Sequence, residues 1–514
     1  MVYLTALVAL VLAPLCIALP DAVDYVIAGG GATGLPLAVR LSEDPSKTVV
    51  VLEAGESGIG NPNITDLRLN RGNFGTANDW QFVTVPQAGA GNRVQDQVQA
   101  RVLGGGSAIN SGMYLRGNKI EYDALETLGA TGWNWNSMFS AVKKSEHFFP
   151  PTVAEIQALG LTFNRDFHGF SGPVALSIQA QNVSRFFPEF AVPTLRALGH
   201  EINPDPNGGN HNGASWDFLT ALPDTSTRSY AVSGYYLPVA NRTNLFVMTN
   251  SHVSRILWAP EKTKSGLLTA TGVEYLDLKE AGGPKSKIIN AKNVIISGSA
   301  LNTPKILELS GVGDSSILQS VGIETRIDLP GVGANLCNQP ITSASYLVKN
   351  GTVDAGNAIR SAIINVQPFN KYLDAIDLER SRKMLSGPPA GLSEPQFRIM
   401  KKMIETTDVP QMEFAWNIAA DSNNVSTLTF DRIILLKPLS RGFVHINSTN
   451  PLDLPIVDPR YLNSPHDKFV FAKAVEYTRT IVNTEPLKSI IEGPVVPGSS
   501  VQTEADFLND VNTR

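Results

Sequence analysis

The sequence predicts an α/β protein that contains a Rossmann-like dinucleotide-binding domain. An apolar strand at residues 25–28 runs directly into a glycine-rich turn at residues 29–34. Leu37 and Leu41 then repeat at helical spacing, and a second apolar strand ends at Glu53. A strand, a glycine-rich turn, a helix and a strand that ends on an acidic residue together form the dinucleotide-binding pattern.

The glycines of this turn have separate tasks in the predicted fold. Gly29 permits the tight turn after the strand, Gly31 lets the backbone approach a pyrophosphate, and Gly34 lets the helix pack closely against the sheet. We expect the phosphates at the helix N-terminus, where free N–H groups and the helix dipole favour an anion. Glu53 can accept hydrogen bonds from a ribose. The pattern therefore predicts an adenosine diphosphate group and leaves the reactive half of the dinucleotide open.

Length and charge limit the classes of function. The 514 residues allow two or three domains with a large core. The net charge of -5 comes with no basic block, so we expect neither a nucleic acid nor an anionic membrane as partner. No paired histidine or cysteine spacing is present, so we expect no metal site.

The N-terminus predicts a secreted protein. An apolar run at residues 4–18 is too short to span a bilayer and ends on small residues, which is typical of a signal peptide at residues 1–18. The run lacks a basic start, so a buried first strand is the alternative. Six acceptor sites for N-glycosylation agree with the secretory pathway, at Asn63, Asn182, Asn241, Asn350, Asn424 and Asn447.

The two cysteines exclude an intramolecular disulfide in the mature protein. Cys16 would leave with the signal peptide, so Cys337 would be the only remaining thiol. We expect Cys337 to be a small buried residue rather than a nucleophile.

Two long stretches carry a resemblance to a known family. Residues 99–117 read QARVLGGGSAINSGMYLRG, and residues 298–313 read GSALNTPKILELSGVG. They resemble the two signatures of the glucose-methanol-choline (GMC) oxidoreductases, a family of flavoenzymes. Shorter landmarks of that family follow in the same order at residues 133–135, 329–336 and 439–442. The resemblance covers nearly the whole chain, and it suggests a protein similar to aryl-alcohol oxidases and dehydrogenases.

The resemblance implies FAD as the cofactor. Covalent relatives carry a histidine where this chain has Ile109, so the resemblance implies that FAD is held non-covalently. Three consecutive glycines in the first signature let backbone N–H groups approach the flavin without side-chain clashes. By position, the pyrophosphate is expected at Ala32 and Thr33, the ribose at Glu53 and Ala54, the flavin at Trp80, Arg101, Gly106, Ser107, Asn110, Ser111, Gly112 and Met113, and adenine at the backbone of Val253.

Chain order predicts a discontinuous FAD-binding Rossmann-like domain with an inserted α+β substrate domain. The FAD domain is expected at residues 21–117 and 294–335, with part of 228–260. The substrate-binding domain and connecting segments are expected at 118–227 and 336–514. Alternating apolar residues, as at 443–446, favour a substrate domain built on an antiparallel sheet.

The catalytic residues of the resembled family have no counterpart in this chain. The family places a histidine, with a second histidine or an asparagine, near the C-terminus in a segment with His-Pro and Gly-Thr patterns. The chain reaches Arg514 without that segment, so we expect a C-terminally truncated member whose catalytic pair lies beyond Arg514. The seven histidines present are interpreted as surface or packing residues.

Three functions therefore stay open. The first is a secreted FAD-dependent oxidoreductase that oxidises a primary or secondary alcohol, such as an aromatic alcohol, a sugar or a secondary-metabolite intermediate. Such an enzyme moves a hydride to flavin N5 and passes electrons to oxygen or a quinone. The second is an inactive flavin-binding remnant. The third is a lyase or cyclase in which the flavin has a structural role.

Overall fold

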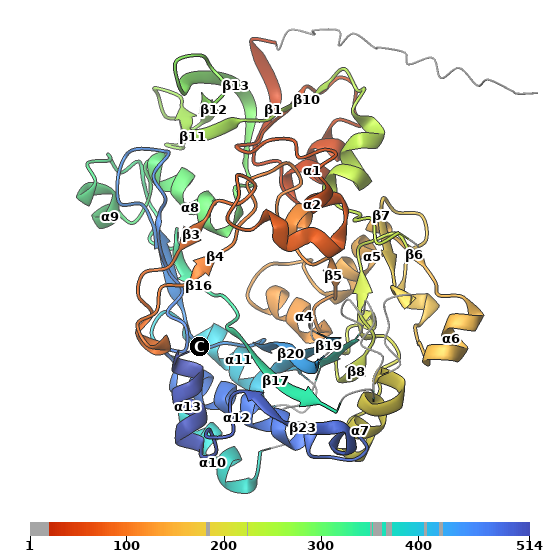
Figure 1. Cartoon of the computed structure of the whole chain (residues 1–514). Helices are drawn as coiled ribbons and strands as arrows, with labels where there is room; N and C mark the ends of the chain where they lie inside the picture. Colours follow the sequence, from red (N-terminus) through yellow and green to blue (C-terminus); the bar gives the residue numbers. More distant parts are fainter. Residues whose placement is uncertain are drawn as a thin grey trace, which may run out of the picture.

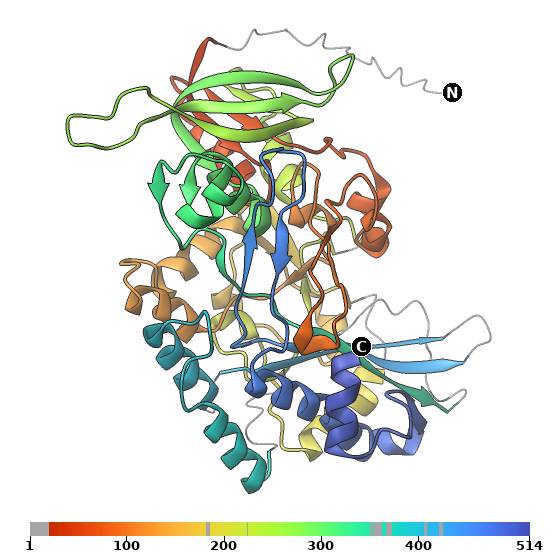
Figure 2. The ribbon, with the colours of Figure 1, turned by 90° about the vertical axis from the view of Figure 1, so that its left-hand side faces the viewer.

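Two six-stranded sheets at opposite ends of the molecule organise the chain (Figures 1 and 2). The computed structural model describes residues 20–180, 186–223, 225–349, 352, 362–365, 373–405, 409–420 and 425–513. The predicted signal peptide lies outside these residues. Among the helices described, none has the length and apolar character needed to cross a bilayer.

The first sheet, here called the nucleotide sheet, has a parallel half and an antiparallel half. Its strands lie in the order β10 (Leu245–Met248), β2 (Val49–Leu52), β1 (Ala22–Ala28), β13 (Lys285–Ile296), β12 (Ala270–Asp277) and β11 (Ser251–Trp258). Strands β10, β2, β1 and β13 are parallel to one another, whereas β12 and β11 continue the sheet in antiparallel pairs.

Helices cover both faces of the parallel half. Ile27 and Val51 point to one face, where they pack with Ala38 of α1 (Gly34–Leu41). Val26 and Val50 point to the other face, in a cluster that includes Ile306 of α8 (Ser299–Leu309). Because both faces are covered, the strands read as continuous apolar runs. The predicted Rossmann-like α/β fold is confirmed.

The second sheet, here called the antiparallel sheet, lies in the lower part of Figure 1. Its order is β23 (Ile491–Val496), β17 (Ile341–Val348), β20 (Ser426–Leu435), β19 (Met412–Ala420), β18 (Ala362–Asn365) and β8 (Gly213–Ser215), with every pair antiparallel. One face packs against α12 (Pro465–Val482) in an apolar core that contains Phe414, Trp416, Phe430 and Val470. The predicted antiparallel sheet is confirmed, whereas its role as a substrate-binding domain stays a prediction.

Shorter elements fill the space between and around the two sheets. The small sheets consist of β3 (Phe82–Val83) with β4 (Asp96–Gln97), β5 (Met113–Tyr114) with β9 (Phe218–Leu219), β7 (Val174–Ser177) and β6 (Glu146–Phe149), β14 (Val312–Gly313) with β15 (Ile327–Asp328), and β16 (Ala334–Leu336) with β21 (Gly442–His445) and β22 (Ile456–Asp458). The remaining α-helices are α2 (Pro62–Thr65), α3 (Gly106–Ile109), α4 (Lys119–Thr127), α5 (Trp135–Ser145), α6 (Val153–Leu159), α7 (Val192–Ala197), α9 (Ser315–Ser320), α10 (Ala375–Met384), α11 (Glu394–Glu405) and α13 (Glu504–Thr513).

The structure corrects the expectation for Cys337, which is exposed rather than buried. It directly follows β16, a short strand at the edge of its sheet whose residues are themselves exposed or half-buried. Of the six glycosylation sites predicted, Asn241 and Asn447 are exposed and Asn63 is half-buried. Asn182, Asn350 and Asn424 lie outside the described residues.

Candidate cofactor site

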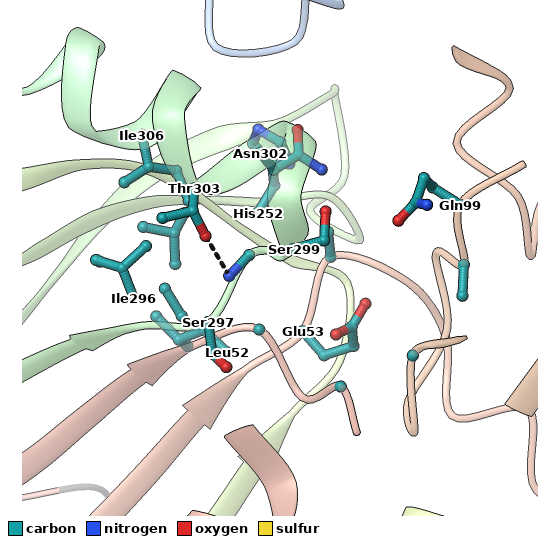
Figure 3. A pocket seen from close by; sticks show the side chains of 18 of the residues that line it. Leu52, Glu53, Gln99, His252, Ile296, Ser297, Ser299, Asn302, Thr303 and Ile306 are labelled. Atoms are coloured by element: carbon teal, nitrogen blue, oxygen red, sulfur yellow. Dashed lines mark hydrogen bonds between the residues drawn. The ribbon is translucent and has the colours of Figure 1, made fainter. Parts of the chain in front are cut away.

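A pocket of about 440 Å³ opens where β1, β2 and β13 end, beside the start of α8 (Figure 3). Segments far apart in the sequence line it. These are the glycine turn, the end of β2, the loop before α3, the start of β11 and the first turns of α8. In an open α/β sheet, the carboxyl ends of the strands are where a ligand binds.

In the glycine turn, Gly31 borders the open pocket, whereas Gly29 is packed closely against the backbone of Ser297. Gly29 has φ +107°, and a Cβ atom there would lie 2.4 Å from the carbonyl oxygen of Ser297. A Cβ atom on Gly31 would meet only the Cα of Gly105, at 3.8 Å. Gly34 begins α1, and its Cβ would lie 2.1 Å from the oxygen of Gly29. Gly29 and Gly34 are therefore required by packing, whereas Gly31 borders free space in the pocket.

Glu53 holds the glycine turn in place. Its carboxylate accepts hydrogen bonds from the backbone N–H of Gly30 at 2.9 Å and of Gly55 at 2.8 Å. Burial raises the pKa of this carboxyl, and the two amide donors and Arg101 oppose that rise. A carboxylate has about four lone-pair sites, so Glu53 keeps acceptor capacity for ribose hydroxyls.

The first family signature forms a second glycine loop against the first. Gly104 has φ +93° and donates its N–H to the oxygen of Gly30 at 2.8 Å. At Gly105, φ is +55° and an added Cβ would lie 2.7 Å from the Cα of Gly31. The two loops thus touch backbone to backbone, and a side chain at Gly105 would separate them.

Arg228, to which no role was given from the sequence, fixes the rest of this loop. The guanidinium is buried and donates to the side-chain and backbone oxygens of Asn110, at 2.6 Å each, and to the oxygen of Ile64 at 2.7 Å. Burial lowers its pKa to about 10, so the side chain stays protonated at neutral pH. Arg228 is 118 residues away from Asn110 in the sequence, so no local sequence pattern predicts this contact.

The predicted cofactor residues fall into two groups. The first group lines the pocket: Gly29, Gly31, Ala32, Thr33, Glu53, Ala54, Trp80, Gly106 and Val253. The second group lies beside it. Gly34 packs behind the turn, and the Arg101 guanidinium lies 5.0 Å from the ring centre of Trp80. Ser107 is on α3, Asn110, Ser111 and Gly112 follow this helix, and Met113 begins β5.

One wall of the pocket comes from residues to which the sequence assigned no cofactor role. His252 of β11 and Asn302, Thr303, Lys305 and Ile306 of α8 all line the pocket. Four of these residues belong to the second signature, which identified the family but assigned no role to a side chain. Thr303 accepts a hydrogen bond from the N–H of Gly298 at 3.1 Å and so closes the turn into α8 (Figure 3).

Two charged side chains, Glu413 and Arg432, lie on the face of the antiparallel sheet opposite its apolar core. Met412 and Phe414 of β19 point into the core, so Glu413 between them points to the opposite face. On β20, Arg432 pairs in register with Ala415, on the same face as Glu413, and donates to the hydroxyl of Ser111 at 3.3 Å. Burial raises the pKa of Glu413 to about 7, and Arg432 opposes that rise.

The site and the fold define an α/β protein with a dinucleotide-binding pocket, and comparison with known proteins gives the family. A model of the N-terminal domain of the GMC oxidoreductases matches residues 23–341, and the model of their C-terminal domain matches residues 438–513. The chain belongs to the GMC oxidoreductases, whose members are FAD-dependent enzymes, and FAD is its cofactor.

Relatives and solved structures agree with this assignment. The chain is 34% identical over 482 residues to a glucose oxidase-like protein, fsoC, of Humicola fuscoatra, covering 92% of this chain and 81% of that protein. It is 28% identical over 507 residues to pyranose dehydrogenase 3 of Leucoagaricus meleagris, covering 95% and 81%. An FAD-dependent oxidoreductase from Chaetomium thermophilum has a TM-score of 0.85 at 30% identity, covering 95% and 87%. A fungal aryl-alcohol oxidase, at 24% identity and 96% and 88% coverage, shares the fold with a TM-score of 0.81.

These matches correct one expectation. We expected a C-terminally truncated member, but the family's C-terminal domain is matched at residues 438–513, so truncation is not supported. The matched region forms β21, β22, α12, β23 and α13. The short His-Pro and Gly-Thr pattern is a poor marker for a domain, because packed helices and strands rather than one loop make up most of it.

Proposed function

We propose that this protein oxidises a primary or secondary alcohol with non-covalently held FAD. The single observation that supports the proposal best is the pocket at the strand ends, whose glycine turn and buried Glu53 fit the adenosine diphosphate part of FAD. Bound FAD would supply the acceptor for a hydride from the carbon that carries the hydroxyl group.

The flavin end is expected along the loop of Asn110 to Met113. Ile109, which is 4% exposed, sits at the position of the histidine in covalent relatives and has no nucleophilic atom. Flavin should therefore be released when the protein unfolds. Acid precipitation followed by absorbance of the supernatant tests this directly, and flavin that stays with the protein pellet would contradict it.

The alcohol is expected between this loop and the antiparallel sheet. Loss of the hydroxyl proton needs an acceptor whose pKa lies near the working pH. Glu413 has a pKa of about 7 and faces the side of the sheet from which Arg432 reaches Ser111. We therefore propose that Glu413 takes part in moving this proton, in addition to any residue outside the described part of the chain.

Anaerobic mixing of the yellow protein with candidate alcohols tests the proposal. Loss of the oxidised-flavin absorbance with an aromatic alcohol or a sugar, together with formation of the carbonyl product, would support it. Reoxidation by oxygen or by a quinone then identifies the electron acceptor. Product without bleaching would favour a lyase or cyclase, and the absence of both across the panel would favour an inactive flavin-binding protein.

We also propose that the protein is secreted and glycosylated. The apolar run at residues 4–18 and the exposure of Asn241 and Asn447 support this proposal. Expression of the full chain in a eukaryotic host should give secreted protein that begins near residue 19 and loses mass on treatment with an N-glycosidase. Protein retained in the cytosol with residues 1–18 intact would contradict it.

A further inference from the structure

Two buried polar side chains of α8 face the cofactor pocket without a partner. Asn302 is 6% exposed and Lys305 is 3% exposed, and both line the pocket. The side-chain oxygen of Asn302 and the ammonium of Lys305 have no hydrogen-bond partner among the described residues. The two residues are three apart on a helix, so they lie on one face and within reach of one ligand.

The burial of these two polar groups without partners lowers the stability of the folded state unless a ligand forms hydrogen bonds with them. Burial of an unpaired ammonium is among the costlier arrangements in a protein, and buried polar atoms almost always have partners. Burial lowers the pKa of Lys305 to about 8, with only Asp453 opposing that shift. The helix therefore presents a donor and an acceptor that the folded chain itself does not use.

The neighbouring His252 forms no hydrogen bond with either residue of the pair. His252 lies beside the pair, but its Nε2 is already hydrogen-bonded to the oxygen of Pro451 at 2.8 Å. Burial lowers the pKa of His252 to about 4, so its ring is neutral. Ile296 and Ile306 supply an apolar wall beside the pair, and Figure 3 shows Asn302 on the α8 side of the pocket, away from Glu53. A flat base with a polar edge fits these walls.

We propose that Asn302 and Lys305 recognise the edge of the adenine base that carries the amino group. Adenine presents its N6 amino donor next to a ring-nitrogen acceptor. The oxygen of Asn302 would accept from the amino group, and the ammonium of Lys305 would donate to the ring nitrogen beside it. Glu53 then binds the ribose from the other side, and the pair on α8 makes the site selective for an adenine dinucleotide.

Flavin affinity of the full-length protein gives the first test. FAD is removed and titrated back, with flavin fluorescence as the readout. Lys305→Met should weaken FAD binding by about 10- to 100-fold and Asn302→Leu by about 10-fold, as for lost hydrogen bonds to a buried ligand. Lys383→Met is the control, because Lys383 is on α10 and its side chain is 76% exposed.

Stability of the FAD-free protein separates recognition from a structural role. Lys305→Met removes an unpaired buried charge, so the melting temperature of the FAD-free variant should equal or exceed that of the parent. If the variant melts lower and still binds FAD as the parent does, Lys305 is a structural residue and the proposal is wrong.

Base analogues give the decisive test, and they do not depend on catalysis. Binding of ADP, inosine diphosphate, 7-deaza-ADP and 1-deaza-ADP to the FAD-free protein is measured by calorimetry. The parent should bind ADP about 10-fold more tightly than inosine diphosphate and than one of the two deaza analogues. In Lys305→Met, ADP and that deaza analogue should bind with equal affinity. Equal affinity of the parent for all four would overturn the proposal.

Discussion

Gly29 and Gly31 stand in the same turn, but the structure requires them for different reasons. Gly29 has a left-handed backbone and no room for a side chain, whereas Gly31 has room that faces the pocket. A glycine can be needed for the fold of the turn or for the approach of a ligand, and replacement of each residue separates the two needs.

Alanine at these two positions should give opposite results. Gly31→Ala should leave the free energy of unfolding of the FAD-free protein within about 1 kcal/mol of the parent but weaken FAD binding at least 10-fold, because the new methyl group enters the pocket. Gly29→Ala should cost about 3 kcal/mol or more, from the clash with Ser297 and the backbone strain. Denaturant unfolding and flavin titration measure both. Full FAD affinity in Gly31→Ala would show that phosphate does not approach this residue.

Glu53 can be tested by a change of one atom. Glu53→Gln leaves one acceptor oxygen for the two N–H groups of Gly30 and Gly55. We expect the variant to lose about 1–3 kcal/mol of FAD binding free energy, because its single acceptor oxygen is taken by the turn and the charged acceptor for the ribose hydroxyls is lost. Equilibrium titration with FAD measures the loss, and unchanged affinity would remove Glu53 from the ribose site.

Strand β19 shows how one element serves both the core and the site. Phe414 contributes to the apolar core with α12, and Glu413 beside it is buried on the opposite face. Period-two alternation sends neighbouring residues to opposite faces of a sheet. A carboxyl in this position does not add to the stability of the fold at neutral pH, because its burial disfavours the charged form.

The stability of the protein should therefore depend on the ionisation of Glu413. Its pKa is raised from the ordinary 4.5 to about 7, so the folded state holds a proton that the unfolded state has already lost. This contribution is complete below pH 4.5 and disappears as the pH rises through 7, for a total of about 3 kcal/mol. Relative to the parent, Glu413→Gln should become more stable by up to this amount between pH 5 and pH 8.

Chemical denaturation at several pH values measures this difference. Phe414→Ala is a matched control on the same strand, because it should cost about 3–5 kcal/mol at every pH through loss of core packing. If the difference between Glu413→Gln and the parent does not change with pH, the carboxyl of Glu413 is not held in its neutral form.

At the scale of the whole molecule, the cofactor pocket depends on segments that the fold collects from six regions of the chain. Residues near positions 30, 53, 80, 100, 252 and 302 all line it. FAD binds only when these regions are assembled, so it should stabilise the whole native state. With free FAD at 100 times its dissociation constant, the free energy of unfolding should rise by about 2.7 kcal/mol.

Thermal unfolding with and without added FAD tests this coupling. Gly31→Ala is the control, because its weaker FAD binding should give a smaller stabilisation than in the parent at the same FAD concentration. A melting temperature of the parent that does not change with FAD would mean that the pocket is not the flavin site. Unfolding of the nucleotide sheet alone would show that the two sheets are not coupled.

Particular residues show which parts of the site could be predicted from the sequence. The strand, glycine turn and Glu53 are contiguous enough for spacing to define their geometry, and nine residues predicted for the cofactor do line the pocket. Arg228 and Arg432 could not be placed, because the residues to which they donate are distant in sequence and no local pattern encodes such contacts. Cys337 was placed wrongly, because burial depends on which edge of a sheet the chain reaches.

The sequence by itself determined the nucleotide-binding turn, the family and hence FAD, because these depend on local backbone geometry and on long ordered motifs. Tertiary structure alone decided which buried polar groups lack partners. Asn302 and Lys305 become a donor and acceptor pair only when α8 packs against the end of the nucleotide sheet and water is excluded from them. Burial and the pairing of distant groups are properties of the assembled molecule, so no reading of spacing along the chain reveals them.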